Sequence, residues 1–289
     1  MIDVIIIGNG PAGISAALYA RRGGLRTLVI GRDNGSLAKA DKIENYFGFA
    51  QPVSGEELIN DGIVSAKRLG VDVITDEVIG MQYNGNIIIK TQQGQYEALS
   101  AIIATGITRN APKIKGLAQF EGKGVSYCAV CDGFFYRGKD VCVIGEGSYA
   151  AHEAAELLPI VNTVTIATNG ADISAYVPDG VKVITEKITE VKGAGLVESI
   201  EFENGETLNV SGIFIAVGAA GSTDLAKKVG AQIDGNKIIV DDNMATNVPG
   251  LYAAGDCTAG MLQISKAVYD GAKAGTEVIK YVRKQKATK

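Results

Sequence analysis

Two cysteines separated by two residues, Cys128 and Cys131, have the most evident chemistry in this chain; they lie within SYCAVCDGFF at 126–135. A zinc site needs about four ligands, and the chain offers no second CxxC and only one histidine. A structural disulfide that closes so short a loop would add little stability. A redox dithiol is therefore favoured, and no metal site is expected. Asp132 follows directly and is placed to give or take the proton that accompanies thiol–disulfide exchange, although an Asp before Gly133 also suits a turn.

The other cysteines and the histidine have simpler interpretations. Cys142 lies in the apolar stretch DVCVIG and is expected to be a core residue. Cys257 is expected to fill space beside a predicted Gly-Asp turn, and His152 is expected to pack on or against a predicted helix.

A glycine-rich turn near the N-terminus predicts where a dinucleotide would bind. The stretch IDVIII has the apolar pattern of a buried parallel strand, and a helical stretch follows GNGPAG. The residues of this turn are Gly8, Gly10, Pro11, Ala12 and Gly13. In a strand–turn–helix unit the glycines permit the tight turn, the close approach of backbone to a pyrophosphate, and the packing of helix on strand. The helix N-terminus adds free N–H groups for the phosphates.

The second strand of this unit, RTLVIG, ends without the acidic residue that usually binds a ribose. Gly31, Arg32 and Asp33 stand at that position. Asp33 is the residue placed to substitute for the missing acid.

The same pattern recurs in the second half of the chain. DVCVIG predicts a strand, and GEGSYA places Gly145, Gly147 and Ala150 in GxGxxA spacing before a helical stretch. Further strands ending in glycine are expected at 101–106 and 212–218. The pattern predicts an α/β protein with two Rossmann-like, three-layer dinucleotide-binding domains, the second inserted in the first. The expected limits are 1–109 with 222–289 for the first domain and 110–221 for the second.

Composition limits the class of protein. The 289 residues are enough for about two domains, and a net charge of −4 makes nucleic acid an unexpected partner. No apolar run reaches the roughly 18 residues of a membrane span, and the N-terminus lacks the basic region of a signal peptide. Four cysteines in so long a chain are too few for a secreted disulfide scaffold and favour a reducing, cytoplasmic compartment.

Five motifs together resemble the low-molecular-weight thioredoxin reductase family of FAD flavoproteins. They are GNGPAG near the start, IENYFGF at 43–49, ATG at 104–106, CAVCDG at 128–133, and AAGDC followed by Gln263. The resemblance covers nearly the whole chain and implies a homodimer that binds FAD in its first domain and reduces thioredoxin. It implies that the FAD site joins the first glycine turn to Gly31, Arg32, Asn45, Val78, Ala104, Thr105, Gly106, Gly255, Asp256, Gln263 and Ile264.

The resemblance also implies roles for the two cysteines. Cys131 is expected nearer the flavin, where it receives the electrons, and Cys128 is expected to attack the thioredoxin disulfide as a thiolate. Because the dithiol must meet both flavin and thioredoxin, we expect the middle domain to rotate about hinges near 109–113 and 219–223.

The middle domain departs from the family where NADPH is normally bound. The family's HRRxxxR-type segment is replaced by TIATNGADIS at 165–174, and no Arg occurs from 141 to 222. This span carries three lysines against eleven acids, a net charge of −8, which leaves +4 for the rest of a chain whose total is −4. Glu146 stands inside the glycine turn. The acid that binds an NADH ribose is expected about 20 residues after the first glycine, but the positions from Thr165 to Gly170 hold none and Asp172 is poorly placed. Each charge-assisted bond to phosphate is worth about 1.5–3 kcal/mol, so tight pyridine-nucleotide binding is not expected.

This pattern is similar to the ferredoxin-dependent flavin thioredoxin reductases, which implies ferredoxin as the electron donor. Ferredoxin is acidic, so a basic docking face is expected. The C-terminal tail KYVRKQKATK is one candidate, although a basic helix end also complements its own dipole. Two alternatives stay open: an NAD(P)H-dependent thioredoxin reductase with unusual contacts, and a non-catalytic flavin-binding regulatory protein, which the intact CxxCDG disfavours.

Overall fold

The computed structural model describes residues 2–106 and 112–288. The chain divides into two compact units, Met1–Thr108 with Gly221–Lys289 as unit 1, and Arg109–Ala220 as unit 2. The α/β class with two Rossmann-like folds, predicted from the sequence, is confirmed. The predicted domain junction at 109–110, and most of the first predicted hinge, lie outside the described residues.

A parallel sheet forms the centre of unit 1, in the order β3-β2-β1-β6-β17. Its strands are β1 (Ile2–Ile7), β2 (Thr27–Gly31), β3 (Asp72–Thr75), β6 (Gln95–Ile103) and β17 (Leu251–Ala253). Residues 3–7 of β1 and all of β2 are buried. Strands covered on both faces need a continuous apolar run, which is what IDVIII and TLVIG supply.

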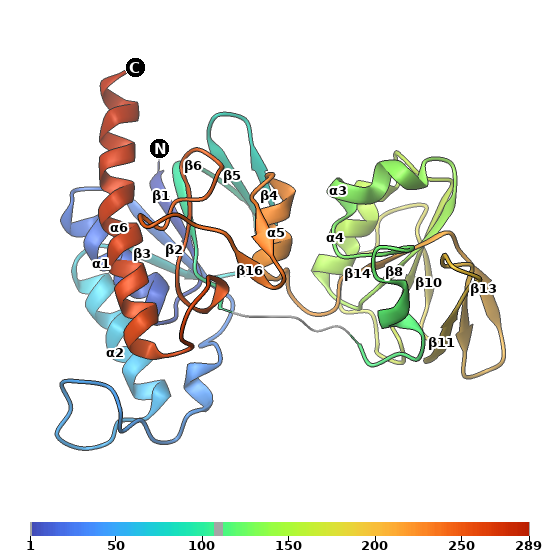
Figure 1. The fold of residues 1–289 in the computed structure, drawn as a ribbon, viewed down its shortest axis with the longest axis horizontal. Helices are drawn as coiled ribbons and strands as arrows, with labels where there is room; N and C mark the ends of the chain where they lie inside the picture. The colour runs from blue at the N-terminus through green and yellow to red at the C-terminus, as the bar shows by residue number, and fades with distance from the viewer. Residues whose placement is uncertain (1, 107–111, 289) are drawn as a thin grey trace. The chain divides into compact units, whose positions relative to one another are not determined.

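Helices α1 (Pro11–Arg22), α2 (Gly55–Arg68) and α6 (Ile264–Ala287) gather on one side of this sheet (Figure 1). Helix α6 packs closely against α1. A β-carbon at Gly271 would lie 2.1 Å from the Ala12 carbonyl oxygen, and one at Gly275 would lie 2.5 Å from the Ala16 carbonyl oxygen. Glycine therefore lets the two backbones approach. The contact brings the first turn of α1 beside the start of α6.

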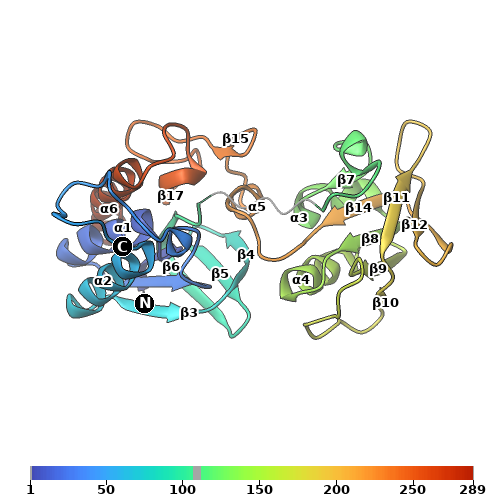
Figure 2. The ribbon, with the colours of Figure 1, turned by 90° about the horizontal axis from the view of Figure 1, so that it is seen from below.

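The remaining elements of unit 1 are short. Strands β4 (Val78–Tyr83) and β5 (Ile87–Thr91) form an antiparallel meander with the beginning of β6. Figure 2 shows this meander away from α1, α2 and α6. The other pieces are η1 (Leu37–Lys39), α5 (Ser222–Lys228), η4 (Gly255–Cys257), and the hairpin β15 (Ile233–Asp234) with β16 (Lys237–Ile238).

Unit 2 repeats the parallel arrangement in the order β10-β9-β8-β14-β7. The strands are β7 (Val125–Ser126), β8 (Asp140–Ile144), β9 (Thr163–Ala167), β10 (Lys182–Ile184) and β14 (Gly212–Ile215). A second, antiparallel sheet contains β11 (Ile188–Lys192), β12 (Ser199–Phe202) and β13 (Thr207–Asn209). The helical pieces are η2 (Leu117–Phe120), α3 (Ala129–Asp132), η3 (Gly133–Tyr136) and α4 (Ser148–Leu157).

The expected strands are present, but two of them end earlier than their sequence patterns. The strand expected at 101–106 ends at Ile103 and the one expected at 212–218 ends at Ile215, because the chain leaves each sheet before the glycine. Over the described residues, no helix is long and apolar enough to cross a membrane.

Candidate functional site

In the turn between β1 and α1, two glycines are required by the packing of the backbone and one is not. A β-carbon at Gly8 (φ +109°) would lie 2.4 Å from the Ala104 carbonyl oxygen, and one at Gly13 would lie 1.8 Å from that of Gly8. A β-carbon at Gly10 would meet no atom within 4 Å, and its φ of −75° suits any residue. The space in front of Gly10 is therefore open to a ligand, as expected for a pyrophosphate.

Three strand ends bring further predicted residues to the same edge of the sheet. The backbone N–H of Ala104 donates to the Ile7 carbonyl at 2.8 Å, and that of Ala254 donates to the Ile103 carbonyl at 2.9 Å. The chain then turns at Gly255 (φ +83°), where a β-carbon would lie 2.8 Å from that of Ala12. Ligands of open α/β sheets bind at this carboxyl edge.

One observation shows that this edge lacks a partner that a cofactor could supply, and a second shows which segments meet there. The Thr105 Oγ1 atom is buried and makes no hydrogen bond to any described residue. The Asn45 side-chain amide donates to the Gln263 carbonyl oxygen at 3.1 Å, which ties the loop IENYFGF to the residue preceding Ile264 and α6. A buried hydroxyl is normally paired, so a polar group of a bound molecule is the expected partner of Thr105.

The end of β2 is more polar than the sequence suggested. Arg32 pairs with Asp33 at 2.9 Å, and Asp33 also accepts the Gly35 N–H at 2.7 Å, so the Asp33 carboxylate is already engaged. Nearby Asp76, whose N–H donates to the Gly31 carbonyl, has a buried Oδ2 with no partner among the described residues. Burial raises the pKa of the adjacent Glu77. Asp76 was not singled out by any motif, because a lone acid after a short strand has no sequence signature.

The predicted contact Val78 begins β4 and is buried. Gly31 is packed against Asn9, whose side chain would lie 2.4 Å from a β-carbon there. Gly106 has φ +70° and open surroundings. These positions stay predictions as cofactor contacts.

In unit 2, Cys128 and Cys131 are joined in a disulfide with an S–S distance of 2.11 Å. Cys128 is 2% exposed and caps α3, while Cys131 is exposed. The N–H of Cys131 donates to the Cys128 sulfur at 3.2 Å. The Ser126 hydroxyl donates to Asp132 Oδ2 at 2.6 Å. A backbone N–H aimed at Cys128 favours its thiolate once the disulfide is opened.

Helix α4 contributes a residue that no motif pointed to. Glu153 is 1% exposed, and its Oε2 accepts the N–H of Ala129, the residue after Cys128, at 2.8 Å. Glu153 and Ala129 are 24 residues apart in the sequence. The signal available in the sequence was an acid within a helix whose neighbours are mostly alanine.

The two free cysteines have the roles expected from their apolar surroundings. Cys142 and Cys257 are fully buried, and burial raises the pKa of each thiol to about 12. His152 lies beside Glu156 with 3.8 Å between the Nε2 and Oε1 atoms. Within the described part of the chain, no group of three His, Cys, Asp or Glu side chains could hold a metal ion.

The sequence and fold match known proteins closely. Residues 2–271 match the pyridine nucleotide-disulphide oxidoreductase family. The thioredoxin reductase of Peptoclostridium acidaminophilum is 35% identical over 309 residues, covering 97% of this chain and 96% of that protein. The atypical thioredoxin reductase TRi from Desulfovibrio vulgaris Hildenborough is 41% identical, with a TM-score of 0.92 over 99% of both chains. A ferredoxin-flavin thioredoxin reductase from Clostridium acetobutylicum is 30% identical, with a TM-score of 0.70, over 100% of this chain and 99% of that one.

This chain belongs to the thioredoxin reductase family. Proteins of this family bind FAD, and this chain is an FAD flavoprotein. The open space at Gly10 and the unpartnered hydroxyl of Thr105 fit a dinucleotide cofactor at the carboxyl edge of the unit 1 sheet. When bound, FAD supplies a ring system that can exchange electrons with a disulfide.

The second glycine turn is hydrogen-bonded to a segment that follows β9. The Glu146 carbonyl accepts the Ser174 N–H at 2.8 Å and the Ser174 hydroxyl at 3.0 Å. The segment from Thr168 to Ser174 is thus bonded back onto the turn. It offers neutral side chains and one acid, Asp172, where a 2′-phosphate would need cations.

Proposed function

We propose that this chain reduces the disulfide of thioredoxin through FAD and the Cys128–Cys131 pair, with ferredoxin rather than NADPH as the electron donor. The donor is inferred chiefly from segment 168–174, which contains no basic residue and is hydrogen-bonded to the glycine turn of unit 2. As the family resemblance implies, we also propose a homodimer in the cytoplasm.

The dithiol step follows the chemistry of thiol–disulfide exchange. The Cys128 thiolate attacks one sulfur of the thioredoxin disulfide, forms a mixed disulfide, and releases the other thioredoxin sulfur as a thiolate. Cys131 then attacks Cys128, which restores the Cys128–Cys131 disulfide and releases the second thioredoxin thiolate. Two electrons pass to thioredoxin, and two protons complete its thiols. Asp132, held by Ser126, is the proposed proton carrier.

The exposure of the two sulfurs makes the cysteine roles testable. In the disulfide form Cys131 is exposed and Cys128 is buried, so attack by Cys128 requires its sulfur to become accessible after reduction. The hydrogen bond from the Cys131 N–H supports Cys128 as the attacking thiolate.

A trapping experiment separates the two roles. The reduced Cys131→Ser variant is mixed with a thioredoxin that lacks its resolving cysteine and whose remaining cysteine is activated as a mixed disulfide with thionitrobenzoate. Attack by Cys128 then releases thionitrobenzoate, and a stable enzyme–thioredoxin mixed disulfide should accumulate. The matched Cys128→Ser variant should accumulate much less. The yield of mixed disulfide is measured by non-reducing gel or intact mass. A higher yield for Cys128→Ser than for Cys131→Ser would assign the attack to Cys131.

The electrostatics of unit 2 disfavour NADPH. The span 141–222 is entirely described, contains no Arg, and carries a net charge of −8. Losing two or three charge-assisted bonds of about 1.5–3 kcal/mol each would weaken NADPH binding by orders of magnitude. The likeness to a ferredoxin-flavin thioredoxin reductase supports the same conclusion. An NAD(P)H-dependent reductase remains the alternative, because most similar proteins are named only as thioredoxin reductases.

The basic C-terminal tail is a poor docking site for that donor. At 1.5 Å per residue, Lys280 is about 24 Å along α6 from Ile264, where the FAD residues begin. Three of its cations are also engaged: Lys280 pairs with Glu277, Lys286 pairs with Asp3, and Arg283 donates to the Gly23 carbonyl. The donor is therefore proposed to dock nearer the carboxyl edge of the unit 1 sheet.

An anaerobic titration decides the donor. The oxidised protein is mixed in parallel with NADPH, NADH and reduced ferredoxin, and loss of the visible flavin absorption is followed by stopped flow. An NADPH-dependent thioredoxin reductase serves as the positive control for the nucleotides. We expect rapid bleaching by ferredoxin alone. Rapid bleaching by either nucleotide would establish the NAD(P)H alternative, and failure of the dithionite-reduced protein to reduce thioredoxin would favour a non-catalytic flavoprotein.

A further inference from the structure

The turn that follows β17 depends on glycine and is pressed against the first turn of α1. Gly255 adopts φ +83°, and a β-carbon there would lie only 2.8 Å from that of Ala12. The next residue, Asp256, is a proposed FAD contact. Small movements of this turn would therefore shift Asp256 relative to the glycine turn that faces the pyrophosphate.

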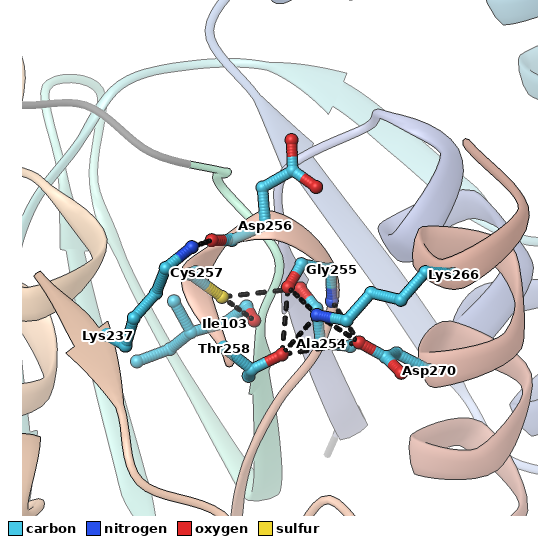
Figure 3. Close-up of polar contacts among 9 residues, drawn as sticks. All are labelled: Ile103, Lys237, Ala254, Gly255, Asp256, Cys257, Thr258, Lys266 and Asp270. Carbon is cyan, nitrogen blue, oxygen red and sulfur yellow. Dashed lines mark hydrogen bonds and ion pairs between the residues drawn. The ribbon is translucent and has the colours of Figure 1, made fainter. Parts of the chain in front are cut away.

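One lysine holds this turn from the side of α6. The Lys266 ammonium has three polar neighbours: the Gly255 carbonyl at 2.7 Å, Thr258 Oγ1 at 2.7 Å, and Asp270 Oδ2 at 2.8 Å (Figure 3). Asp270 is 3% exposed, and its Oδ2 also lies 3.2 Å from the Gly255 N–H. An ammonium has three donors, so these three acceptors satisfy it completely.

A second lysine holds the turn from the opposite side. Lys237, in β16, donates from its ammonium to the Asp256 carbonyl at 2.5 Å. Figure 3 shows the Lys237 and Lys266 side chains reaching the turn from different directions. The same view shows the Asp256 carboxylate directed away from both ammonium groups.

Two successive carbonyls, of Gly255 and Asp256, are thus each bound by an ammonium. A backbone carbonyl needs only a neutral donor, and placing two partly buried cations beside one turn costs desolvation energy. The arrangement leaves the Asp256 carboxylate without a partner among the described residues, while fixing the backbone that carries it.

We infer that Lys237 and Lys266 are positioning residues for FAD, which clamp the Gly255–Asp256 turn so that the Asp256 side chain is held toward the cofactor. The inference rests on the proposed placement of Asp256 in the FAD site. It concerns cofactor binding alone and requires neither a particular electron donor nor thioredoxin.

The competing explanation is that both lysines only stabilise the fold. Lys237 separates the two explanations better than Lys266, because removing Lys266 leaves Asp270 buried and unpaired. Lys237→Met removes the ammonium and leaves no buried acid behind. Lys237→Arg restores a cationic donor at the same position. Lys280→Met is the matched control, since it removes a lysine from an ion pair with Glu277 on the exposed side of α6.

The experiment measures FAD binding to flavin-free protein by quenching of flavin fluorescence, together with the thermal midpoint of the same flavin-free protein. We expect Lys237→Met to raise the FAD dissociation constant about tenfold or more, with an unchanged midpoint, and Lys237→Arg to restore most of the affinity. Lys280→Met should change neither quantity. An FAD affinity of Lys237→Met within twofold of the parent would overturn the inference. A loss of affinity matched by an equal loss of stability in the flavin-free protein would overturn it as well. Neither result would change the conclusions drawn from the donor titration and the thioredoxin assay.

Discussion

At the scale of single residues, the four cysteines differ in chemistry because of their surroundings. Cys128 and Cys131 form a disulfide beside a backbone donor, while Cys142 and Cys257 are fully buried. A thiol reacts as its thiolate. Burial therefore removes the latter pair from redox chemistry even though Cys257 directly follows a proposed FAD contact.

Thiol labelling tests this difference. Burial raises the pKa of Cys142 and Cys257 to about 12, so both thiols are protonated near neutral pH. After reduction of the native protein, iodoacetamide near neutral pH should label Cys128 and Cys131 and leave Cys142 and Cys257 unmodified. Peptide mass spectrometry identifies the labelled cysteines. Labelling of Cys257 as fast as Cys131 in the folded protein would contradict the expectation.

Glu153 is the residue through which α4 reaches the dithiol. Glu153→Leu would leave the buried Ala129 N–H without its acceptor, which costs about 1–3 kcal/mol, whereas Glu153→Gln keeps an acceptor oxygen in the same place. We expect the leucine variant to lose that much unfolding free energy in urea and to slow thioredoxin reduction. The glutamine variant should retain most of both. Equal losses of unfolding free energy and of thioredoxin reduction in the two variants would show that the hydrogen bond to the Ala129 N–H is not the cause of either loss.

At the scale of elements, the first glycine turn shows which glycines serve the fold and which serve the ligand. Gly13→Ala would put a methyl group 1.8 Å from the Gly8 carbonyl oxygen, so this variant should unfold or fail to accumulate. Gly10→Ala meets open space at an ordinary φ and should change the stability of the flavin-free protein by no more than about 1 kcal/mol. It should nevertheless weaken FAD binding strongly, because the methyl group occupies the approach of the pyrophosphate. Calorimetry of the flavin-free protein and FAD titration measure the two effects. If the FAD affinity of Gly10→Ala is unaltered, the pyrophosphate does not bind at Gly10.

The same elements show what the sequence could reveal. Both glycine turns, the strands that precede them and the disulfide pair were predictable, because their signals lie within a few consecutive residues. The Glu153–Ala129 bond, the Ser174–Glu146 bonds and the two-lysine clamp were not. The bonds from Glu153, from Ser174 and from the two lysines to the turn carbonyls join residues 11–28 apart, and these separations follow no helix or strand period. The resemblance to a family supplied the remaining proposed FAD contacts, which local pattern alone could not.

At the scale of the whole molecule, one of the two predicted hinges lies within the described residues. The predicted second hinge, 219–223, is partly fixed: Gly221 caps α5 by donating its N–H to Asp224 Oδ2 at 3.0 Å, and Ser222 and Thr223 are buried. We therefore expect any hinge in this connection to lie before Gly221. Gly218, with φ +70°, is the position there where glycine is conformationally required.

A pair of alanine variants tests whether rotation at this connection limits turnover. Gly218→Ala and Gly230→Ala both place a side chain at a left-handed φ, +70° and +80°, and should each cost about 1–2 kcal/mol of unfolding free energy. Gly230 lies within unit 1 and has no atom within 4 Å of its would-be β-carbon, so it controls for backbone strain alone. If the dithiol must visit flavin and thioredoxin in turn, only Gly218→Ala should slow thioredoxin turnover severalfold, while chemical reduction of its flavin keeps the parental rate. Solution scattering of the oxidised and reduced parent protein should differ for the same reason. Identical scattering in both redox states, with equal turnover in the two variants, would exclude a hinge at this connection.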